Sequence, residues 1–160
     1  MTPAQLATLK AAILADPVLD AYPNTGDGNY DMCAQKLNVV ATPTFTVWRT
    51  SVSIAATGQA FNGTEWAGMT TANHTRLQTV AQYLAQGYSA ALADIRAMFN
   101  DIWSGAGGTS TRATLLALWK RPAWLGEKIF ATGTGSDASP ATMVIEGSIS
   151  YQDVTLARNL

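Results

Sequence analysis

Charged side chains are scarce in this sequence. Of its 160 residues, 13% are Asp, Glu, Lys or Arg, whereas about 25% is usual in soluble domains. The formal net charge is −1. The sequence therefore lacks the excess of basic residues that would predict binding to nucleic acid or to an anionic membrane. Such a composition is typical of a surface partly covered by neighbouring subunits. A monomer coated with Ser, Thr, Asn, Gln and Ala would share it, so both interpretations stay open.

Cysteine and histidine are almost absent. Cys33 is the single cysteine, which excludes an intrachain disulfide. Its helical spacing with Tyr30 and Leu37 predicts a buried apolar residue rather than a nucleophile. His74 is the single histidine, so one subunit cannot build a zinc site from several His and Cys ligands. His74 falls in the first turn of an expected helix, where an exposed or cap-linked side chain is favoured. We predict no metal and no cofactor.

Long apolar runs are missing as well. No window holds the roughly 18 apolar residues that a membrane-spanning helix requires, so we expect no membrane association. The N-terminus lacks the basic region and the apolar stretch of a signal peptide. The chain is therefore expected to be made and kept in the cytosol, unless it is delivered as part of a larger particle.

Most of the chain shows sequence patterns typical of α-helices. Thr2 can cap a first helix with Pro3 at its first position and Gln5 completing a capping box, and Pro17 ends it. A second helix is expected over residues 29–37, and three more helical segments follow Thr70. Their apolar residues recur at helical spacing. The residues predicted to form the core are Leu77, Val80, Leu84, Leu92, Ile95, Phe99, Ile102, Leu115, Leu118 and Trp119.

The minor β element is expected in two places. Residues 44–52 are rich in Thr, Val and aromatics, which favours an extended segment. Near the C-terminus, apolar residues alternate in the manner of a half-buried strand. These residues are Met143, Ile145, Ile149 and Tyr151. The predicted fold is therefore mainly α, a small helical domain with a C-terminal strand that could pair with residues 44–52.

We find no internal repeat and no second domain, so residues 1–160 are predicted to form a single helical domain. Within it, residues 133–160 are a candidate C-terminal docking segment, because Gly133, Gly135 and Ser136 give the chain freedom to leave the helical body. An isolated strand has unpaired backbone groups and an exposed apolar face. Its partner could lie in the same chain or in another; we favour a contact between chains.

No motif predicts chemistry. Gly133 and Gly135 follow a helix and precede a strand, the reverse of the order in a dinucleotide-binding loop. We interpret them as a linker or an adaptable contact loop. The "PNTGDGNYD" stretch lacks the principal ligands of a calcium-binding loop. A catalytic triad needs only one histidine, but no G-x-S-x-G elbow accompanies His74. We predict no catalytic residue and no enzymatic activity.

The tryptophans suggest contact surfaces instead. Trp103, Trp119 and Trp124 lie on apolar helix faces, which predicts core packing. Trp48 and Trp66 lie in weakly periodic segments beside charged residues. Aromatic side chains in an uncharged surround are typical of protein interfaces. Trp48 and Trp66 are therefore interface candidates, together with the alternating residues of the C-terminal strand.

Several stretches resemble one group of proteins along nearly the full chain. They include "MTPAQLATLKAAILADP", "FTVWRTSV", "TTANHTRLQTVAQYL", "DIRAMFNDIWSG", "RATLLALWKRPA", "EKIFATGTGSDASPATM" and "EGSISYQDV". These stretches are similar to short proteins encoded in tailed bacteriophages and prophages of proteobacteria. The resemblance implies a virion structural role in the tail, neck or fibre region. It carries no catalytic residues to transfer.

The leading hypothesis is thus a structural or adaptor protein of a phage virion, made in the host cytoplasm. It would act by self-association into a homo-oligomer and by docking to other virion proteins. A non-virion assembly chaperone is the first alternative, and a small hydrolase using His74 is the second. The station in the particle and the copy number stay open.

Overall fold

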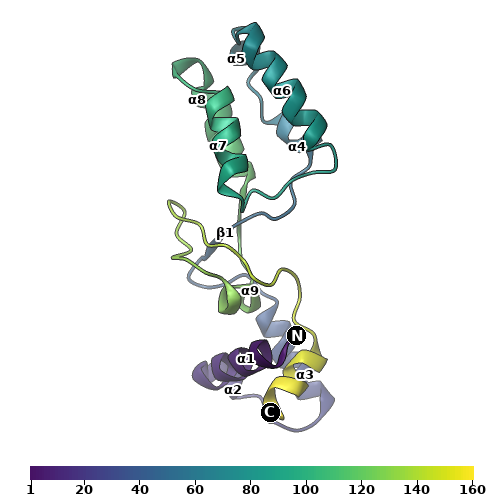
Figure 1. The fold of residues 1–160 in the computed structure, drawn as a ribbon. Helices are drawn as coiled ribbons and strands as arrows, with labels where there is room; N and C mark the ends of the chain where they lie inside the picture. Colours follow the sequence, from purple (N-terminus) through teal and green to yellow (C-terminus); the bar gives the residue numbers. More distant parts are fainter. The chain divides into compact units, whose positions relative to one another are not determined.

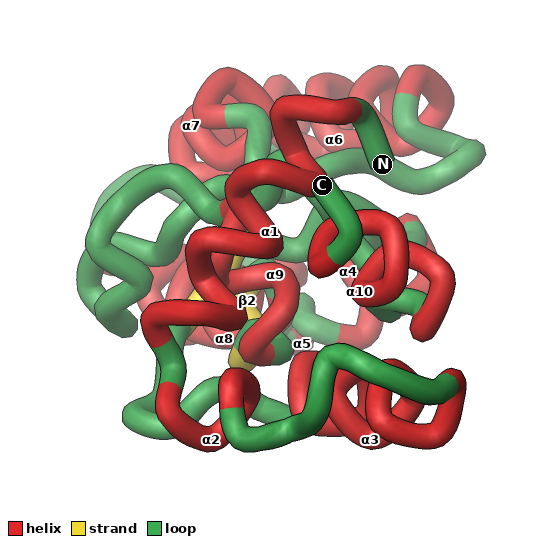
Figure 2. The backbone as a smooth tube through the Cα atoms, turned by 90° about the horizontal axis from the view of Figure 1, so that it is seen from below, coloured by secondary structure: helices red, strands yellow, loops and turns green.

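The computed structural model describes residues 1–160 and is 56% helical, with ten helices and a small two-stranded antiparallel sheet. Figures 1 and 2 show the helices joined by loops, with only short strands between them. The predicted mainly-α fold with a minor β element is confirmed. None of the helices has the length and apolar content needed to span a bilayer.

The elements follow one another along the chain in the order shown in Figure 1. The helices are α1 (Pro3–Ala15), α2 (Pro17–Asp20), α3 (Asp27–Leu37), α4 (Ile54–Gln59), α5 (Gly63–Ala67), α6 (Thr71–Tyr83), α7 (Ala93–Ile102), α8 (Thr109–Leu118), α9 (Leu125–Phe130) and α10 (Tyr151–Arg158). A short 3-10 helix, η1, spans Ala106–Gly108. The two strands are β1 (Thr46–Trp48) and β2 (Lys120–Pro122).

The chain divides into two compact units, and a single domain over residues 1–160 stays a prediction. Unit 1 comprises Met1–Val47 and Pro122–Leu160, and unit 2 comprises Trp48–Arg121. The chain leaves unit 1 within β1 and returns to it within β2. Each unit buries apolar residues of its own.

Unit 1 is built around α1, α3, α9 and α10, which contact one another. The capping box at the start of α1 forms as predicted: Thr2 Oγ1 accepts from the Gln5 amide, and the Gln5 side chain accepts from the Thr2 amide. Leu6, Leu9 and Ile13 of α1 are buried, and the fully buried Cys33 of α3 belongs to the same core. The main core of the unit consists of Leu6, Leu9, Ile13, Leu19, Tyr30, Cys33, Ala34, Leu37, Phe130, Ile149, Val154 and Ala157.

A smaller cluster in unit 1 packs beside β1. The Ala123 amide donates to the Phe45 carbonyl (2.8 Å), and the Ala141 amide donates to the Thr46 carbonyl (2.9 Å). Val47 and Ala141 form a parallel bridge and are both fully buried. The start of the C-terminal segment therefore does pair with residues 44–52, within the same chain.

The strand expected from Met143 to Tyr151 is not formed. In its place the backbone bonds to side chains of its own unit. The Gly147 amide donates to Glu127 Oε1 (3.2 Å), and Asn38 both accepts from the Ile149 amide (2.8 Å) and donates to its carbonyl (2.9 Å). Gly147 has a φ of +107°, which breaks an extended run. Hydrogen bonds to side chains that are distant in sequence therefore take the place of a strand ladder.

Unit 2 contains the predicted helical core. Leu77, Val80, Phe99, Ile102, Leu115 and Trp119 are buried, and Leu84, Ile95 and Leu118 are partly buried against them. The prediction for Leu92 is wrong, because this side chain is 57% exposed. Helix α7 begins only at Ala93, with Leu92 at its N-cap.

Residues 89–92 lie before the helix because their hydrogen bonds go elsewhere. The Ala90 amide donates to the Arg49 carbonyl (2.9 Å), and Ser89 Oγ accepts from the Ala91 amide (3.2 Å). This turn removes Leu92 from the helical stripe. At the other end of the unit, α8 stops at Leu118 and the chain becomes extended through Pro122. Pro122 therefore separates two helices instead of kinking one.

Candidate functional site

Trp66 is the most exposed tryptophan of unit 2, with a relative accessibility of 40%. It lies on α5, whose first turn is capped by Asn62: Asn62 Oδ1 accepts from the amides of Thr64 (3.0 Å) and Glu65 (3.1 Å). Glu65 in turn accepts from the Ser110 and Thr111 amides at the start of α8, both at 2.8 Å. The helix that carries Trp66 is therefore capped by Asn62 and fixed to the start of α8 by Glu65.

Three aromatic rings support the Trp66 indole. Phe61 stacks on it with 5.8 Å between ring centroids and 14° between planes, and the buried Trp103 lies 6.4 Å away. The His74 ring meets Trp66 edge-on at 4.7 Å. Such tilted and offset arrangements are favourable for aromatic pairs. Trp66 is therefore held in place while part of its face stays accessible.

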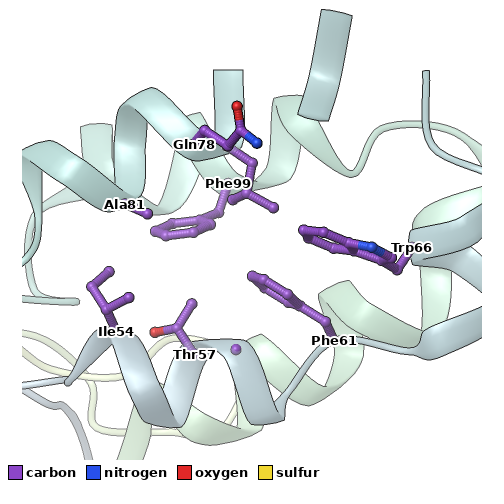
Figure 3. Close-up of a pocket in the computed structure, with 9 residues that line it drawn as sticks. Ile54, Thr57, Phe61, Trp66, Gln78, Ala81 and Phe99 are labelled. Atoms are coloured by element: carbon purple, nitrogen blue, oxygen red, sulfur yellow. The ribbon is translucent and has the colours of Figure 1, made fainter. Parts of the chain in front are cut away.

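Beside Trp66 a pocket of about 140 Å³ opens between α4, α6 and α7. Figure 3 shows α6 with Gln78 and Ala81 on one side, α4 with Ile54 and Thr57 on the other, and the Phe61 and Trp66 rings at one end. The lining residues are Ile54, Thr57, Gly58, Phe61, Trp66, Leu77, Gln78, Ala81 and Phe99. An apolar cavity of this size accommodates a group about as large as a benzene ring.

Thr57 carries the hydroxyl group of the pocket lining, and this hydroxyl is already committed to hydrogen bonds. Thr57 Oγ1 donates to the Ser53 carbonyl (2.9 Å) and lies 2.8 Å from the Tyr88 hydroxyl. The Tyr88 hydroxyl accepts from Trp119 Nε1 (2.9 Å). This buried chain leaves Gln78 as the polar side chain on the rim. The pocket is suited to holding an apolar group, not to positioning a reacting one.

Trp48, the second candidate in unit 2, lies under a cation. The Arg96 guanidinium stands 4.0 Å from the Trp48 ring centroid and donates to the Ala90 carbonyl. Burial lowers the pKa of Arg96, but an arginine stays charged at neutral pH. Arg49 is exposed next to Trp48, and its Nε donates to the Lys120 carbonyl (3.3 Å). This aromatic and cationic surface is the chemistry that recurs at interface hot spots.

The four C-terminal candidates are placed differently. Met143 and Ile149 are buried within unit 1, at 8% and 2% exposure, and Ile145 packs against the main core of that unit. Only Tyr151, on the first turn of α10, is exposed, at 40%. The apolar face for which a partner chain was expected is covered by unit 1 itself.

The glycine loop is also packed within unit 1. The Thr46 amide donates to the Gly135 carbonyl (2.7 Å), and a Cβ added at Gly135 would lie 2.1 Å from the Phe45 ring. Gly135 has a φ of +66°. This position therefore requires glycine for conformation and for close approach, which is a structural role rather than phosphate binding.

His74 lies on the first turns of α6, half-buried against Trp66. No carboxylate or hydroxyl side chain forms a hydrogen bond with its ring. No group of three or more His, Cys, Asp or Glu side chains is placed to hold a metal ion.

Sequence reasoning found Trp48 and Trp66 but missed Phe61 and Arg96, the residues that complete the two surfaces. Phe61 lies in a stretch without periodicity, and Arg96 is far from Trp48 in sequence, so no local pattern indicates either contact. Comparison of the chain with protein-family models, curated proteins and solved structures finds no match.

Proposed function

We propose that this protein is a structural or adaptor protein of a tailed-phage virion, acting by docking to other virion proteins and by self-association. The resemblance described above motivates the setting, and the low charge of the chain suits a surface covered by neighbours. The exposed Trp66 beside an apolar pocket carries the docking part of the proposal.

The occupant proposed for the pocket is one large apolar side chain of another virion protein. Its size matches the cavity of about 140 Å³, and the rim offers Gln78 but no charged side chain. A fixed tryptophan beside an apolar pocket is the typical centre of an interface. Replacing such an anchor by alanine commonly costs about 2 kcal/mol or more, which corresponds to binding about 30-fold weaker.

The test is incorporation into particles. In a phage that encodes this chain, Trp66→Ala should reduce the amount of the protein in purified particles, measured by quantitative mass spectrometry. Ala81→Leu should do the same by filling the pocket while Trp66 stays in place. Tyr83→Ala is the matched control, because Tyr83 is 86% exposed on α6 and does not line the pocket. All three purified variants should melt cooperatively.

Two other outcomes decide for the alternatives. A protein that is required for infectivity yet absent from purified particles is an assembly chaperone. If His74→Ala abolishes infectivity while folding and incorporation are preserved, the loss argues for chemistry at His74, because lost support of Trp66 would instead reduce incorporation. Normal incorporation of both pocket variants rejects the pocket as the docking site.

A further inference from the structure

The two units carry opposite net charge. Unit 1 has four basic residues (Lys or Arg) and eight acidic residues (Asp or Glu), which gives a formal net charge of −4. Unit 2 has six basic and three acidic residues, which gives a net charge of +3. The net charge of the whole chain, −1, is therefore the sum of one acidic and one basic unit. Opposite charges on separate surfaces favour contacts between molecules in which one meets the other.

The basic surface of unit 2 is formed by Arg49 and Arg96 around Trp48. Arg96 stacks on the Trp48 ring at 4.0 Å. The guanidinium hydrogen bonds of Arg49 and Arg96 go to backbone carbonyls of Lys120 and Ala90, and neither arginine has a carboxylate partner in the chain. By contrast, Arg76 of the same unit is paired with Asp101. The basic surface is thus left without counter-charge.

The acidic surface of unit 1 is formed by Asp27 and Asp31 on α3. The two residues are exposed and lie four positions apart, so they share one helix face. Neither forms an ion pair, and Asp31 accepts only from the Gln35 side chain (2.7 Å). Lys36, the exposed lysine of α3, lies on the opposite side of the helix by its spacing.

We propose that the acidic surface of one copy docks on the basic surface of a second copy, so that the protein self-associates head to tail. The inference rests on the proposed function, since it assigns surfaces to the self-association. Arginine forks bind carboxylates in a fixed geometry, and Trp48 supplies an apolar anchor between them. Because two different surfaces meet, the contact repeats from copy to copy and closes into a ring where the rotation allows.

The first test is the salt dependence of association of the full chain, measured by sedimentation velocity. The wild-type protein should form oligomers at low ionic strength, where the Debye length is about 30 Å at 0.01 M salt. It should dissociate at 1 M salt, where that length is about 3 Å. A protein that stays monomeric at low salt, or oligomers that are indifferent to salt, would overturn the proposal.

The second test uses one variant of each surface. Arg49→Glu should weaken self-association more than about tenfold, because like charges placed opposite each other repel. The double variant Asp27→Lys/Asp31→Lys should be impaired as strongly. Arg76→Glu, which makes the same charge change elsewhere in unit 2, should associate like the wild type. Circular dichroism and melting curves establish that each variant is folded.

Mixing the two impaired proteins is the decisive measurement. The Arg49→Glu protein keeps an intact acidic surface, and the Asp27→Lys/Asp31→Lys protein keeps an intact basic one. A head-to-tail contact therefore predicts complexes that contain the two proteins in equal amounts, although neither protein associates alone. A mixture that stays monomeric would refute the two surfaces. The virion role would survive that result if Trp66→Ala still prevents incorporation, so the two proposals fail separately.

Discussion

Glu65 shows how much of unit 2 can depend on one side chain. Its two carboxylate oxygens accept from the Ser110 and Thr111 amides at the start of α8, where unsatisfied N–H groups and the helix dipole favour an anion. Partial burial raises its pKa, but the hydrogen bonds from Thr111 and Ser110 and the charge of Arg112 outweigh burial. The pKa of Glu65 therefore lies below its ordinary value.

This shift has a defined sign. A carboxyl whose pKa is lower in the folded state contributes stability above its unfolded pKa and loses it as the pH falls through the folded value. We therefore predict that Glu65→Gln lowers the melting temperature at pH 7, because one oxygen can no longer serve both amides. The difference from the wild type should shrink once the pH falls below about 4.

The measurement is a series of thermal melts from pH 7 to pH 3. Asp94→Asn is the control, because no backbone or side-chain hydrogen bond reaches the Asp94 carboxylate. A Glu65→Gln protein that melts like the wild type at neutral pH would show that the carboxylate does not support α8.

At the scale of elements, helix α10 closes unit 1. Its N-terminus has a capping box, with Ser150 and Asp153 bonded to each other's amides. Val154 and Ala157 are fully buried. The Arg158 guanidinium donates to the carbonyls of Leu19 (2.7 Å) and Tyr22, so the end of α10 is tied to α2 and to the loop that follows it.

We predict that deleting residues 151–160 unfolds unit 1. The deletion exposes the face that α10 covers on α1 and α3, and it leaves the Leu19 and Tyr22 carbonyls without their charged donor. Hydrogen exchange should show lost protection of the α1 and α3 amides while those of α6 to α8 keep theirs. If α1 and α3 stay protected and only incorporation into particles is lost, the segment is a docking element after all.

The elements that the sequence predicted are those with local signals. Thr2 carries the predicted capping box, and Pro17 ends the first helix because proline lacks a backbone N–H. The irregular path between Met143 and Ser150 has no such signal, since it depends on Asn38 and Glu127, which are distant in sequence. The apolar residues alternate there because buried and exposed side chains alternate along an irregular segment. The predicted strand would have needed a neighbouring strand to pair with, and this segment has none.

The candidate site divides in the same way. Trp48 and Trp66 could be singled out from the sequence because aromatic residues in aperiodic segments are unusual. The pocket beside Trp66 and the cation over Trp48 could not, because α4, α6 and α7 converge only in the folded chain. Leu92 was misplaced because a backbone hydrogen bond from Ala90 to Arg49 delays the start of α7.

For the whole molecule, the division into two units carries the strongest consequence for stability. Leu9 is fully buried in the core of unit 1, and Phe99 is 1% exposed in that of unit 2, between Tyr88 and Trp119. The two residues belong to separate cores. Leu→Ala in a core costs about 2–5 kcal/mol and Phe→Ala about 3–5 kcal/mol.

We predict that these losses stay within their units. Leu9→Ala should speed hydrogen exchange of α1, α3 and α10 while unit 2 keeps its protection, and Phe99→Ala should do the reverse for α6, α7 and α8, because compact units open as separate cooperative bodies. Leu92→Ala, at a site 57% exposed, should change the free energy of unfolding by no more than about 0.5 kcal/mol. Native-state hydrogen exchange with mass spectrometry measures all three. If either core variant lowers protection equally throughout the chain, the two units unfold as one cooperative body.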